Sequence, residues 1–400
     1  MLSAAPTSIV GSPDPGTPRI LFVSHCAQPG GAELILCDLV RDFFPKSEIF
    51  LFEDGPVRLQ MRAAGFDPTV GRRLDALLEI RRDAPLMVDL AFLQAISRAI
   101  MQLARMARRH ELVYANSQKA FITAGLAAVL ARRPLVWHLH DVMTTEHFGT
   151  KQIRVAIGLA NRAARRVIVP SKAVAEAFCA VGGRREKLRV VPNGVSVPAG
   201  TRSLDRASLR AELSLPEGFL ISVVGRIDPE KGQHVALEAL ALLPDAQCLI
   251  VGDAMFGTHD YKEQLHRLVD SLGLRARVRF LGHRTDVPRL MRASDVVVQT
   301  SIRPESFARV IVEAMLCGTP VVGPRKGGVP EILTGDLGAL LYPPGDSVAL
   351  ANLLRSLQLG GQRTARLVEV GFESAERYFS VPRMQRDVNS VIREVLGARQ

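Results

Sequence analysis

A chain of 400 residues, 47% of them hydrophobic, is long enough for two domains with separate cores, and its apolar runs are too short to span a membrane. The net charge of +11 is uneven, because residues 1–199 carry 26 Lys and Arg against 17 Asp and Glu, whereas residues 200–400 carry 25 against 23. A basic first half favours an anionic partner such as a membrane surface or a phosphorylated acceptor; a generally Arg-rich composition is the alternative. One Trp and four Tyr provide no interleaved aromatic and basic pattern, which argues against nucleic acid.

The predicted elements begin after residues 1–18, a Pro-, Ser-, Gly- and Thr-rich stretch that predicts a disordered leader rather than a signal peptide. Apolar strands then alternate with helical patterns. The strands predicted in the first half cover residues 19–23, 48–52, 112–115, 135–139 and 167–169, and those in the second half cover 220–224, 248–251, 278–281, 296–299 and 320–322. Near-continuous apolar strands separated by helices predict parallel sheets with helices on both faces.

Two such sets of strands predict an α/β protein with two doubly wound domains, residues 19–199 and 200–370. A turn-rich segment, 191–195, and a Pro/Gly/Ser linker, 196–202, separate them. Residues 371–400 are predicted to be helical. Five scattered cysteines without metal-ligand spacing predict a reducing cytoplasm and no metal site.

Two segments of the first half, 97–110 and 151–166, have the pattern of basic amphipathic helices. Such helices can lie on an anionic bilayer, which would suit a lipid-linked acceptor. The alternative interpretation is that both are ordinary domain helices with a solvated basic face.

Polar residues follow the predicted strands of the first half, where parallel sheets bind ligands. Gly30 and Gly31, after the first strand, permit close approach of an anion to a helix N-terminus, although a simple tight turn is the alternative. Strand alternation places His138 and His140 on one face of the strand that ends near Asp141. Further positions at the same edge are Asn116, Ser171 and Lys172.

The second half carries a basic turn between a buried strand and a helix, residues 224–232. Arg226 offers a planar fork and Lys231 a point charge, which together suit a phosphate clamp. The alternative is that both are loop charges that pair with Asp228 and Glu230.

Two glutamates eight residues apart, Glu305 and Glu313, flank the predicted start of a helix. Pro304 disfavours helix before it and Ser306 can serve as an N-cap, so the helix is predicted to open near Phe307. Glu305 then lies on the loop, and Glu313 lies two turns into the helix, about 10 Å along its axis. The N–H groups of the first turn face any anionic ligand that docks between them.

These elements resemble the retaining glycosyltransferases of family 4, also described as group 1. The resemblance rests on the Pro-Glu-x-Phe-x5-Glu-Ala element from Pro304, the Gly-Gly-x-Pro-Glu loop from Gly327, and the Gly-Arg…Lys-Gly element from Gly225. It implies the GT-B fold, in which two Rossmann-like domains face a central cleft and the C-terminal helices, here residues 371–400, pack back on the first domain. The family often has Gly-Phe-Gly after the first glutamate, whereas this chain has Ser306-Phe307-Ala308, so the identity of the donor sugar stays open.

The resemblance also implies roles for residues. Arg226 and Lys231 would grip the donor diphosphate without a metal, Glu313 would bind the ribose, and Glu305 would contact the donor sugar. The remaining implied contacts are backbone N–H groups of Ser306, Phe307 and Ala308 to sugar and phosphate, His140 to the donor sugar or acceptor, Gly30 and Gly31 near the phosphate, and His283 and Arg284 near the base. No cofactor is implied, since the nucleotide diphospho-sugar is a co-substrate.

The function implied is retaining transfer of a sugar from a nucleotide diphospho-sugar to a saccharide or glycolipid acceptor, in polysaccharide or cell-envelope synthesis. The protein would act in the cytoplasm, including the inner face of the cytoplasmic membrane. Two alternatives remain at this stage: a sugar-nucleotide epimerase of the same fold, and a non-catalytic protein that binds sugar nucleotides as a scaffold.

Overall fold

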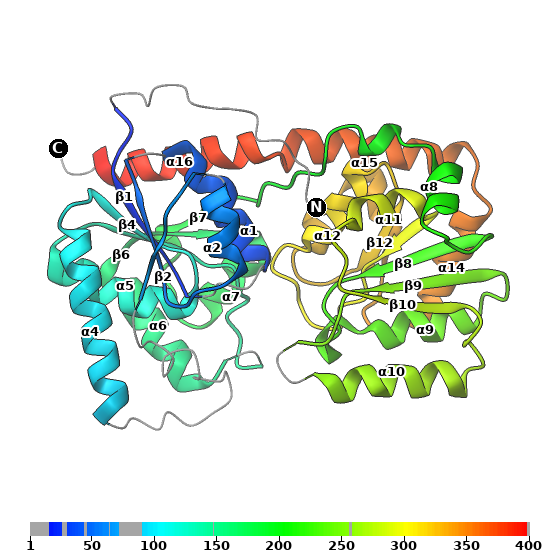
Figure 1. Ribbon diagram of the computed structural model, residues 1–400, viewed down its shortest axis with the longest axis horizontal. Coiled ribbons are helices and arrows are strands. Elements are labelled where there is room, and N and C mark those ends of the chain that lie inside the picture. Colours follow the sequence, from blue (N-terminus) through cyan, green and yellow to red (C-terminus); the bar gives the residue numbers. More distant parts are fainter. Residues whose placement is uncertain are drawn as a thin grey trace. The chain divides into compact units, whose positions relative to one another are not determined.

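The computed structural model describes residues 16–25, 30–43, 46–63, 65–71, 90–146, 148–255 and 258–397. The predicted leader lies almost wholly outside these residues. The chain forms two compact units, one of Val195–Ser380 and the other of the residues up to Gly194 together with those from Val381 onward. Each unit contains its own parallel sheet with helices around it (Figure 1).

The first unit is built on a seven-stranded parallel sheet with the order β3-β2-β1-β4-β5-β6-β7. Its strands are β1 Ile20–Ser24, β2 Glu48–Leu51, β3 Thr69–Val70, β4 Leu112–Ala115, β5 Leu135–His138, β6 Ala164–Val169 and β7 Leu188–Val190. The strand order changes direction between β1 and β4. A ligand site is expected at their carboxyl ends, because the chain leaves the two strands in opposite directions there.

Helices cover both faces of this sheet. Aliphatic and aromatic residues of α1 (Gly31–Val40), α2 (Pro56–Ala63) and α16 (Val381–Gly397) share one core with Phe22 and Tyr114 of the strands. On the other face, α4 (Leu90–Ala107), α5 (Gln118–Ala131), α6 (Thr150–Ala163) and α7 (Lys172–Ala180) share a core around Trp137. Phe121 of α5 stacks on Trp137 with ring centroids 4.1 Å apart, which fixes α5 against the middle of the sheet. Short 3-10 turns follow α1 and precede β7 (Arg41–Phe43 and Arg185–Lys187).

The last helix, α16, is tied to the first unit by a charge cluster. Glu394 accepts hydrogen bonds from Arg166 of β6 and Arg189 of β7. Hydrogen bonds from Arg166, and then from Arg189, lower the pKa of Glu394 to about 2. The predicted C-terminal segment is therefore divided at Ser380, since the preceding helix, α15 (Gln362–Tyr378), lies in the second unit.

The second unit contains a six-stranded parallel sheet with the order β10-β9-β8-β11-β12-β13. Its strands are β8 Phe219–Val224, β9 Ala246–Val251, β10 Val278–Gly282, β11 Val296–Val298, β12 Val321–Pro324 and β13 Leu341–Tyr342. Here the order changes direction between β8 and β11. In each of the two sheets the strand order therefore reverses once. The prediction of two doubly wound α/β domains is confirmed.

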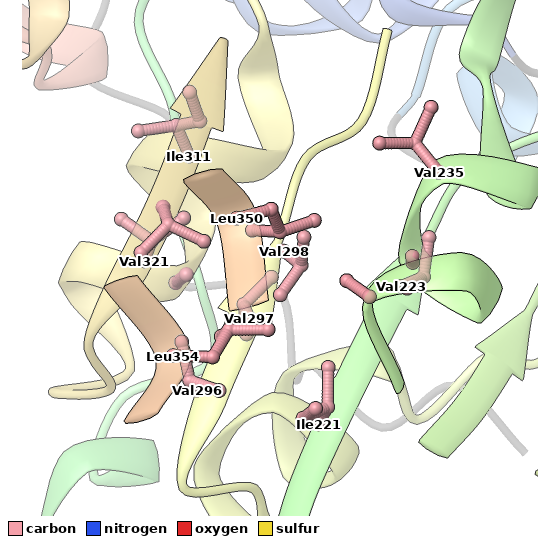
Figure 2. Close-up of a cluster of buried hydrophobic side chains, with 14 of the residues drawn as sticks. Ile221, Val223, Val235, Val296, Val297, Val298, Ile311, Val321, Leu350 and Leu354 are labelled. Atoms are coloured by element: carbon pink, nitrogen blue, oxygen red, sulfur yellow. The ribbon is translucent and has the colours of Figure 1, made fainter. Parts of the chain in front are cut away.

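Buried aliphatic side chains form the core of the second unit. Ile221 and Val223 of β8, the three valines of β11 and Leu350 of α14 (Ser347–Gln358) come together there (Figure 2). The helical elements of the unit are η3 Thr201–Ser203, α8 Arg206–Glu212, η4 Pro229–Lys231, α9 Gln233–Ala241, α10 His259–Ser271, α11 Val287–Ala293, α12 Arg309–Leu316, α13 Val329–Ile332, η5 Gly335–Leu340, α14 Ser347–Gln358 and α15. No helix among the described residues has the length and apolarity to cross a bilayer.

One helix boundary in the first half was predicted wrongly. The helix expected to end at Arg166 ends at Ala163, and residues 164–166 already belong to β6. Arg166 pairs with Val136 in the sheet and its guanidinium reaches Glu394. Strand pairing and this tertiary ion pair therefore override the helical pattern.

Candidate active site

The candidate site of the second unit lies where β8 and β11 end side by side. Gly225 and Arg226 follow β8, and Gln299 follows β11. Gly225 has a φ of +148°, and a Cβ on Gly252 would lie 2.0 Å from the Gly225 carbonyl oxygen. The two glycines thus let the ends of β8 and β9 approach each other closely, and their N–H groups donate to the carbonyl oxygens of Val251 and Gly282.

Lys231 is brought to Glu305 by a tight turn. The next residue, Gly232, has a φ of +62°, and a Cβ there would lie 2.5 Å from the carbonyl oxygen of Thr300. The hydroxyl of Thr300 also donates to the Lys231 carbonyl oxygen at 2.7 Å. The turn therefore packs directly on the loop after β11, and the Lys231 ammonium lies 2.5 Å from Oε1 of Glu305.

Glu305 is held by three donors that converge on one oxygen. Besides Lys231, the hydroxyl of Ser301 and Nε2 of Gln299 donate to Oε1, the latter at 3.1 Å. Burial acts to raise the pKa of Glu305, but the charge and hydrogen bond of Lys231, the Ser301 hydroxyl and the charge of Arg226 bring it below its usual value. Glu305 is therefore a carboxylate at neutral pH, with Oε1 anchored.

The second glycine-rich loop supports the backbone of Glu305. Gly327 has a φ of +62°, and a Cβ there would lie 2.4 Å from the Glu305 carbonyl oxygen. The N–H of Gly328 donates to the same oxygen at 2.8 Å. Residue 327 must therefore be glycine on two grounds, backbone conformation and space, and the loop fixes where Glu305 lies.

The other charges of the basic turn are paired as well. The Arg226 guanidinium lies 2.9 Å from the Asp228 carboxylate, whereas Glu230 pairs with Arg303 at 2.6 Å. Of the loop pairs considered as an alternative, the structure contains the one between Arg226 and Asp228. It does not pair Lys231 with Glu230, because Lys231 points to Glu305 instead.

The helix that carries Glu313 begins later than predicted. α12 opens at Arg309, and its N-cap is Ala308, in the left-handed region at a φ of +53°. Ser306 is not the N-cap, and Phe307 is buried outside the helix. Glu313 consequently lies one turn into α12 rather than two, and its Oε1 accepts from Nε of Arg309 at 2.7 Å.

This late start leaves backbone donors beside the two glutamates. The N–H of Ile311 donates to the carbonyl oxygen of Ala308 at 3.0 Å, and by the geometry of a helix start the N–H groups of Arg309 and Val310 have no acceptor within the helix. These donors can meet an anionic or hydroxyl-rich ligand, as predicted, although from residues further along the chain.

The residues proposed for the base lie after β10. Gly282 has a φ of +63°, His283 is exposed, and Arg284 is half-buried. Both Nε and Nη2 of Arg284 donate to the Asp286 carboxylate, at 2.8 and 2.7 Å, and these bonds lower the pKa of Asp286. Arg284 is therefore committed to its neighbour, and the exposed His283 offers the ring that a ligand can reach.

The first unit has a polar cluster at the carboxyl ends of β1 and β4. Gly30 is the N-cap of α1 and Gly31 its first residue. Asn116, directly after β4, donates from Nδ2 to the Ala32 carbonyl oxygen at 3.0 Å, and its Oδ1 lies 3.1 Å from Nε2 of His140. The structure thus brings the glycine pair, Asn116 and His140 together.

The protonation of His140 follows from this network. Because Nδ2 of Asn116 donates to a carbonyl, its Oδ1 must accept, so Nε2 of His140 carries the proton. Burial lowers the pKa of His140 to about 3, and its Nδ1 has no hydrogen-bond partner among the described residues. His140 is therefore neutral at neutral pH, with an acceptor nitrogen, and is unsuited to general acid catalysis there.

Two of the other polar side chains at this edge, those of His138 and Ser171, form hydrogen bonds within the fold. His138 is fully buried and bonded to the Tyr114 hydroxyl at 2.7 Å. Ser171 is the N-cap of α7 and accepts from the N–H of Val174, and Lys172 is the first residue of that helix.

Three residues of these sites were not singled out from the sequence. Gln299 and Ser301 hold Glu305, and Glu33 of α1 is buried with its carboxylate beside Gly30. Burial raises the pKa of Glu33 to about 7. For Gln299 and Ser301 a signal existed, since polar residues directly after a buried strand of a parallel sheet lie at its ligand-binding edge.

Two parallel sheets, each with a polar site where its strand order reverses, define a protein of two Rossmann-like domains. Residues 205–373 match the family described as glycosyl transferases group 1, and residues 57–197 match Glycosyltransferase Family 4. D-inositol 3-phosphate glycosyltransferase of Salinispora tropica is 30% identical over 337 residues, which cover 77% of this chain and 68% of that protein. The chain belongs to the group 1 glycosyl transferases, Glycosyltransferase Family 4.

Solved structures share this architecture. Anabaena HepE, in a complex with UDP and glucose, is 36% identical with a TM-score of 0.82 over 94% of this chain and 99% of that one; another structure of HepE contains UDP-glucose. A glycosyltransferase from Rickettsia africae, 18% identical, has a TM-score of 0.79 over 95% and 99% of the two chains, a likeness of fold alone. D-inositol 3-phosphate glycosyltransferase of Mycobacterium sp. (strain KMS) is 36% identical over 211 residues, 52% of this chain, and the match spans about half, 48%, of that relative.

Proposed function

We propose that this chain transfers a sugar from a nucleotide diphospho-sugar to a hydroxyl group of a saccharide or lipid-linked acceptor, with retention at the anomeric carbon. The observation that carries the proposal is the pair of Lys231, from the turn after β8, and Glu305, from the loop after β11, in a chain related to a protein crystallised with UDP-glucose. A cation beside an anchored carboxylate suits a ligand that is anionic at one end and rich in hydroxyls at the other.

The roles of the side chains follow from their charge and place. Arg226 and Lys231 bind the donor diphosphate, and the backbone donors in the first turn of α12 assist them. Oε2 of Glu305 accepts from a hydroxyl of the sugar, and Glu313 accepts from the ribose hydroxyls. We place the base beside His283 and Arg284, which follow β10. Gly30, Gly31 and His140 of the first unit contact the sugar or the acceptor.

The chemical step breaks the bond between the anomeric carbon and the diphosphate oxygen and forms a bond between that carbon and the acceptor oxygen. The acceptor proton passes to the departing phosphate on the same face of the sugar, which accounts for retention without a protein nucleophile. Negative charge develops on the leaving diphosphate, and each preorganised donor that meets it contributes about 3 kcal/mol to catalysis. Arg226 and Lys231 supply two positive charges at that place, so the reaction needs no metal ion.

We assign acceptor recognition to the region with the fewest motifs, about residues 56–109, of which the structure describes all but residues 64 and 72–89. We assign the reaction to the cytoplasm and its membrane face, where nucleotide sugars and lipid-linked acceptors meet, and to the synthesis of a polysaccharide or glycolipid.

The proposal is tested by following the fate of UDP-glucose in the presence of EDTA by proton NMR, with water or added glucose as acceptor. We expect release of UDP and a product whose newly formed anomer is α, as in the donor. A β product would contradict retention, and activity only after addition of a divalent cation would contradict metal independence. Binding without turnover over a range of acceptors would favour the scaffold alternative, and an epimerised sugar would favour the epimerase.

A further inference from the structure

The outer sides of three neighbouring helices in the first unit are basic and apolar at once. α5 packs against α4 and against α6, and all three cover the same face of the sheet (Figure 1). None of the three helices contains an acidic residue, and residues 90–166 as a whole carry 12 Lys and Arg against 3 Asp and Glu. We call the exposed sides of α4, α5 and α6 the basic–apolar face.

The middle helix of this face exposes aliphatic side chains. Leu126, Val129 and Leu130 of α5 are 42%, 57% and 53% exposed, and Val155 of α6 is 56% exposed. Residues 126, 129 and 130 are three and four positions apart, so they share one side of the helix. That side is available because Phe121 and the alanines of α5 face the sheet.

The two helices that pack against α5 carry exposed arginines. Arg98 and Arg105 lie on α4, and Arg154 and Arg162 lie on α6. Positive charge around exposed aliphatic residues is the combination that inserts shallowly into an anionic bilayer, with the apolar groups at the acyl boundary and the guanidinium groups at lipid phosphates. A second copy of the chain would instead bring like charge against like charge.

We propose that the basic–apolar face docks on the surface of an anionic phospholipid bilayer. The interaction is independent of the transferase reaction, because it uses none of the residues assigned to the donor or the acceptor. It would place the first unit at the membrane and give access to an acceptor that is itself a lipid.

The test is cosedimentation of the full chain with vesicles of phosphatidylcholine alone or of equimolar phosphatidylcholine and phosphatidylglycerol, without donor or acceptor. We expect binding to the mixed vesicles only, and its loss at high salt. The variant R98Q/R154Q should bind about 25-fold more weakly, at about fivefold for each charge. The variant V129S/L130S should bind at least about tenfold more weakly.

Matched controls separate a docking face from general charge or hydrophobicity. R363Q/R386Q removes two exposed arginines elsewhere, and V348S/L359S replaces residues of the second unit that are 57% and 84% exposed. Both controls should bind as the unchanged protein does. Equal weakening in the controls, binding to neutral vesicles alone, no binding to any vesicle, or a dimer in solution that V129S/L130S dissociates would each overturn the proposal.

A second inference concerns the three donors around Glu305. Gln299 is 6% exposed, and its Nε2 reaches both Ser301 and Glu305, at 2.7 and 3.1 Å. All three donors, including Lys231, bind Oε1, and within the described part of the chain Oε2 receives no hydrogen bond. One carboxylate oxygen is therefore fixed by the protein while the other is available.

We infer that Gln299 and Ser301 are positioning residues that aim Oε2 of Glu305 at a hydroxyl of the donor sugar. The inference rests on the proposed function, since it assumes that Glu305 meets the sugar. Gln299 and Ser301 act through Glu305 and do not touch the nucleotide, so their loss should affect the sugar and leave the nucleotide bound.

The test compares Ser301→Ala and Gln299→Leu with the unchanged chain, and Ser301→Thr serves as the control that keeps the hydroxyl. The UDP dissociation constant is measured by calorimetry, and UDP release from UDP-glucose is measured against pH. We expect UDP affinity to change less than about twofold and kcat to fall at least about tenfold, with recovery in Ser301→Thr. The acidic limb of kcat should move to higher pH, because loss of a donor to Oε1 raises the pKa of Glu305.

The two failures are distinguishable. If the unchanged chain neither binds UDP nor releases it from UDP-glucose, the proposed function is wrong and the inference falls with it. If the unchanged chain is active and Ser301→Ala and Gln299→Leu keep its kcat and pH profile, the positioning role alone is wrong.

Discussion

Replacing Lys231 by methionine tests the electrostatic core of the proposed site. Methionine keeps much of the length of the stem and removes the ammonium that lies 2.5 Å from Glu305. The leaving diphosphate then loses one of its two side-chain cations, which corresponds to about 3 kcal/mol and about a hundredfold fall in kcat. Glu305 also loses one of three donors to Oε1 while its side chain is only 17% exposed, so the free energy of unfolding should fall by about 1–3 kcal/mol.

The assay has two parts, UDP release from UDP-glucose and urea denaturation. The control is Lys262→Met, which removes a cation 2.7 Å from Asp253, in the same unit but outside the assigned donor contacts. We expect the control to keep kcat within about threefold, because an exposed ion pair contributes little. Full turnover in Lys231→Met, or an equal loss in Lys262→Met, would refute the role of Lys231 in stabilising the leaving group.

Four further predictions follow from individual residues. Glu313→Ala should weaken UDP binding at least about tenfold by calorimetry, and unchanged affinity would remove Glu313 from the ribose site. Ala308→Gly should raise the free energy of unfolding by about 1 kcal/mol in a urea titration, since it relieves a φ of +53°, and destabilisation would contradict that strain. His140→Asn should reduce the loss of stability between pH 6.5 and 3, because the unfolded imidazole binds a proton there that the folded one, with a pKa of about 3, does not; an unchanged slope would argue against a neutral His140. Glu394→Gln should cost about 1 kcal/mol at pH 7, and the difference should vanish as the pH falls from 4.5 through the folded pKa of about 2; a difference that persists at the lowest pH would contradict the ion-pair account.

The central strands of both sheets could be predicted from the sequence because they are apolar on both faces. The predicted 112–115 coincides with β4, and 220–224 differs from β8 by one residue. The edge strands β3, β7 and β13 were missed, since two or three residues paired on one side only leave no periodic pattern.

Which residues form the site could be predicted from the sequence better than how those residues are arranged. Lys231 and Glu305 were recognised as candidates, but 74 positions separate them and only the fold brings them together. The start of α12 was placed two residues early, because the N-cap preference of Ser306 is a local tendency and Ala308 adopts a left-handed conformation that its sequence does not announce. Gln299 and Ser301 follow β11 directly, so their place at the ligand-binding edge was predictable, whereas their convergence on Oε1 of Glu305 depends on the conformation of the loop.

The measurement that tests the central claim most directly is calorimetry of UDP, GDP and ADP and their sugars in the presence of EDTA, on the unchanged chain and on Arg226→Ala. We predict metal-independent binding of one nucleotide family, with the affinity at least about tenfold lower in the variant. Absence of binding to all of them, or equal binding by Arg226→Ala, would contradict the assignment of a donor site to the second unit.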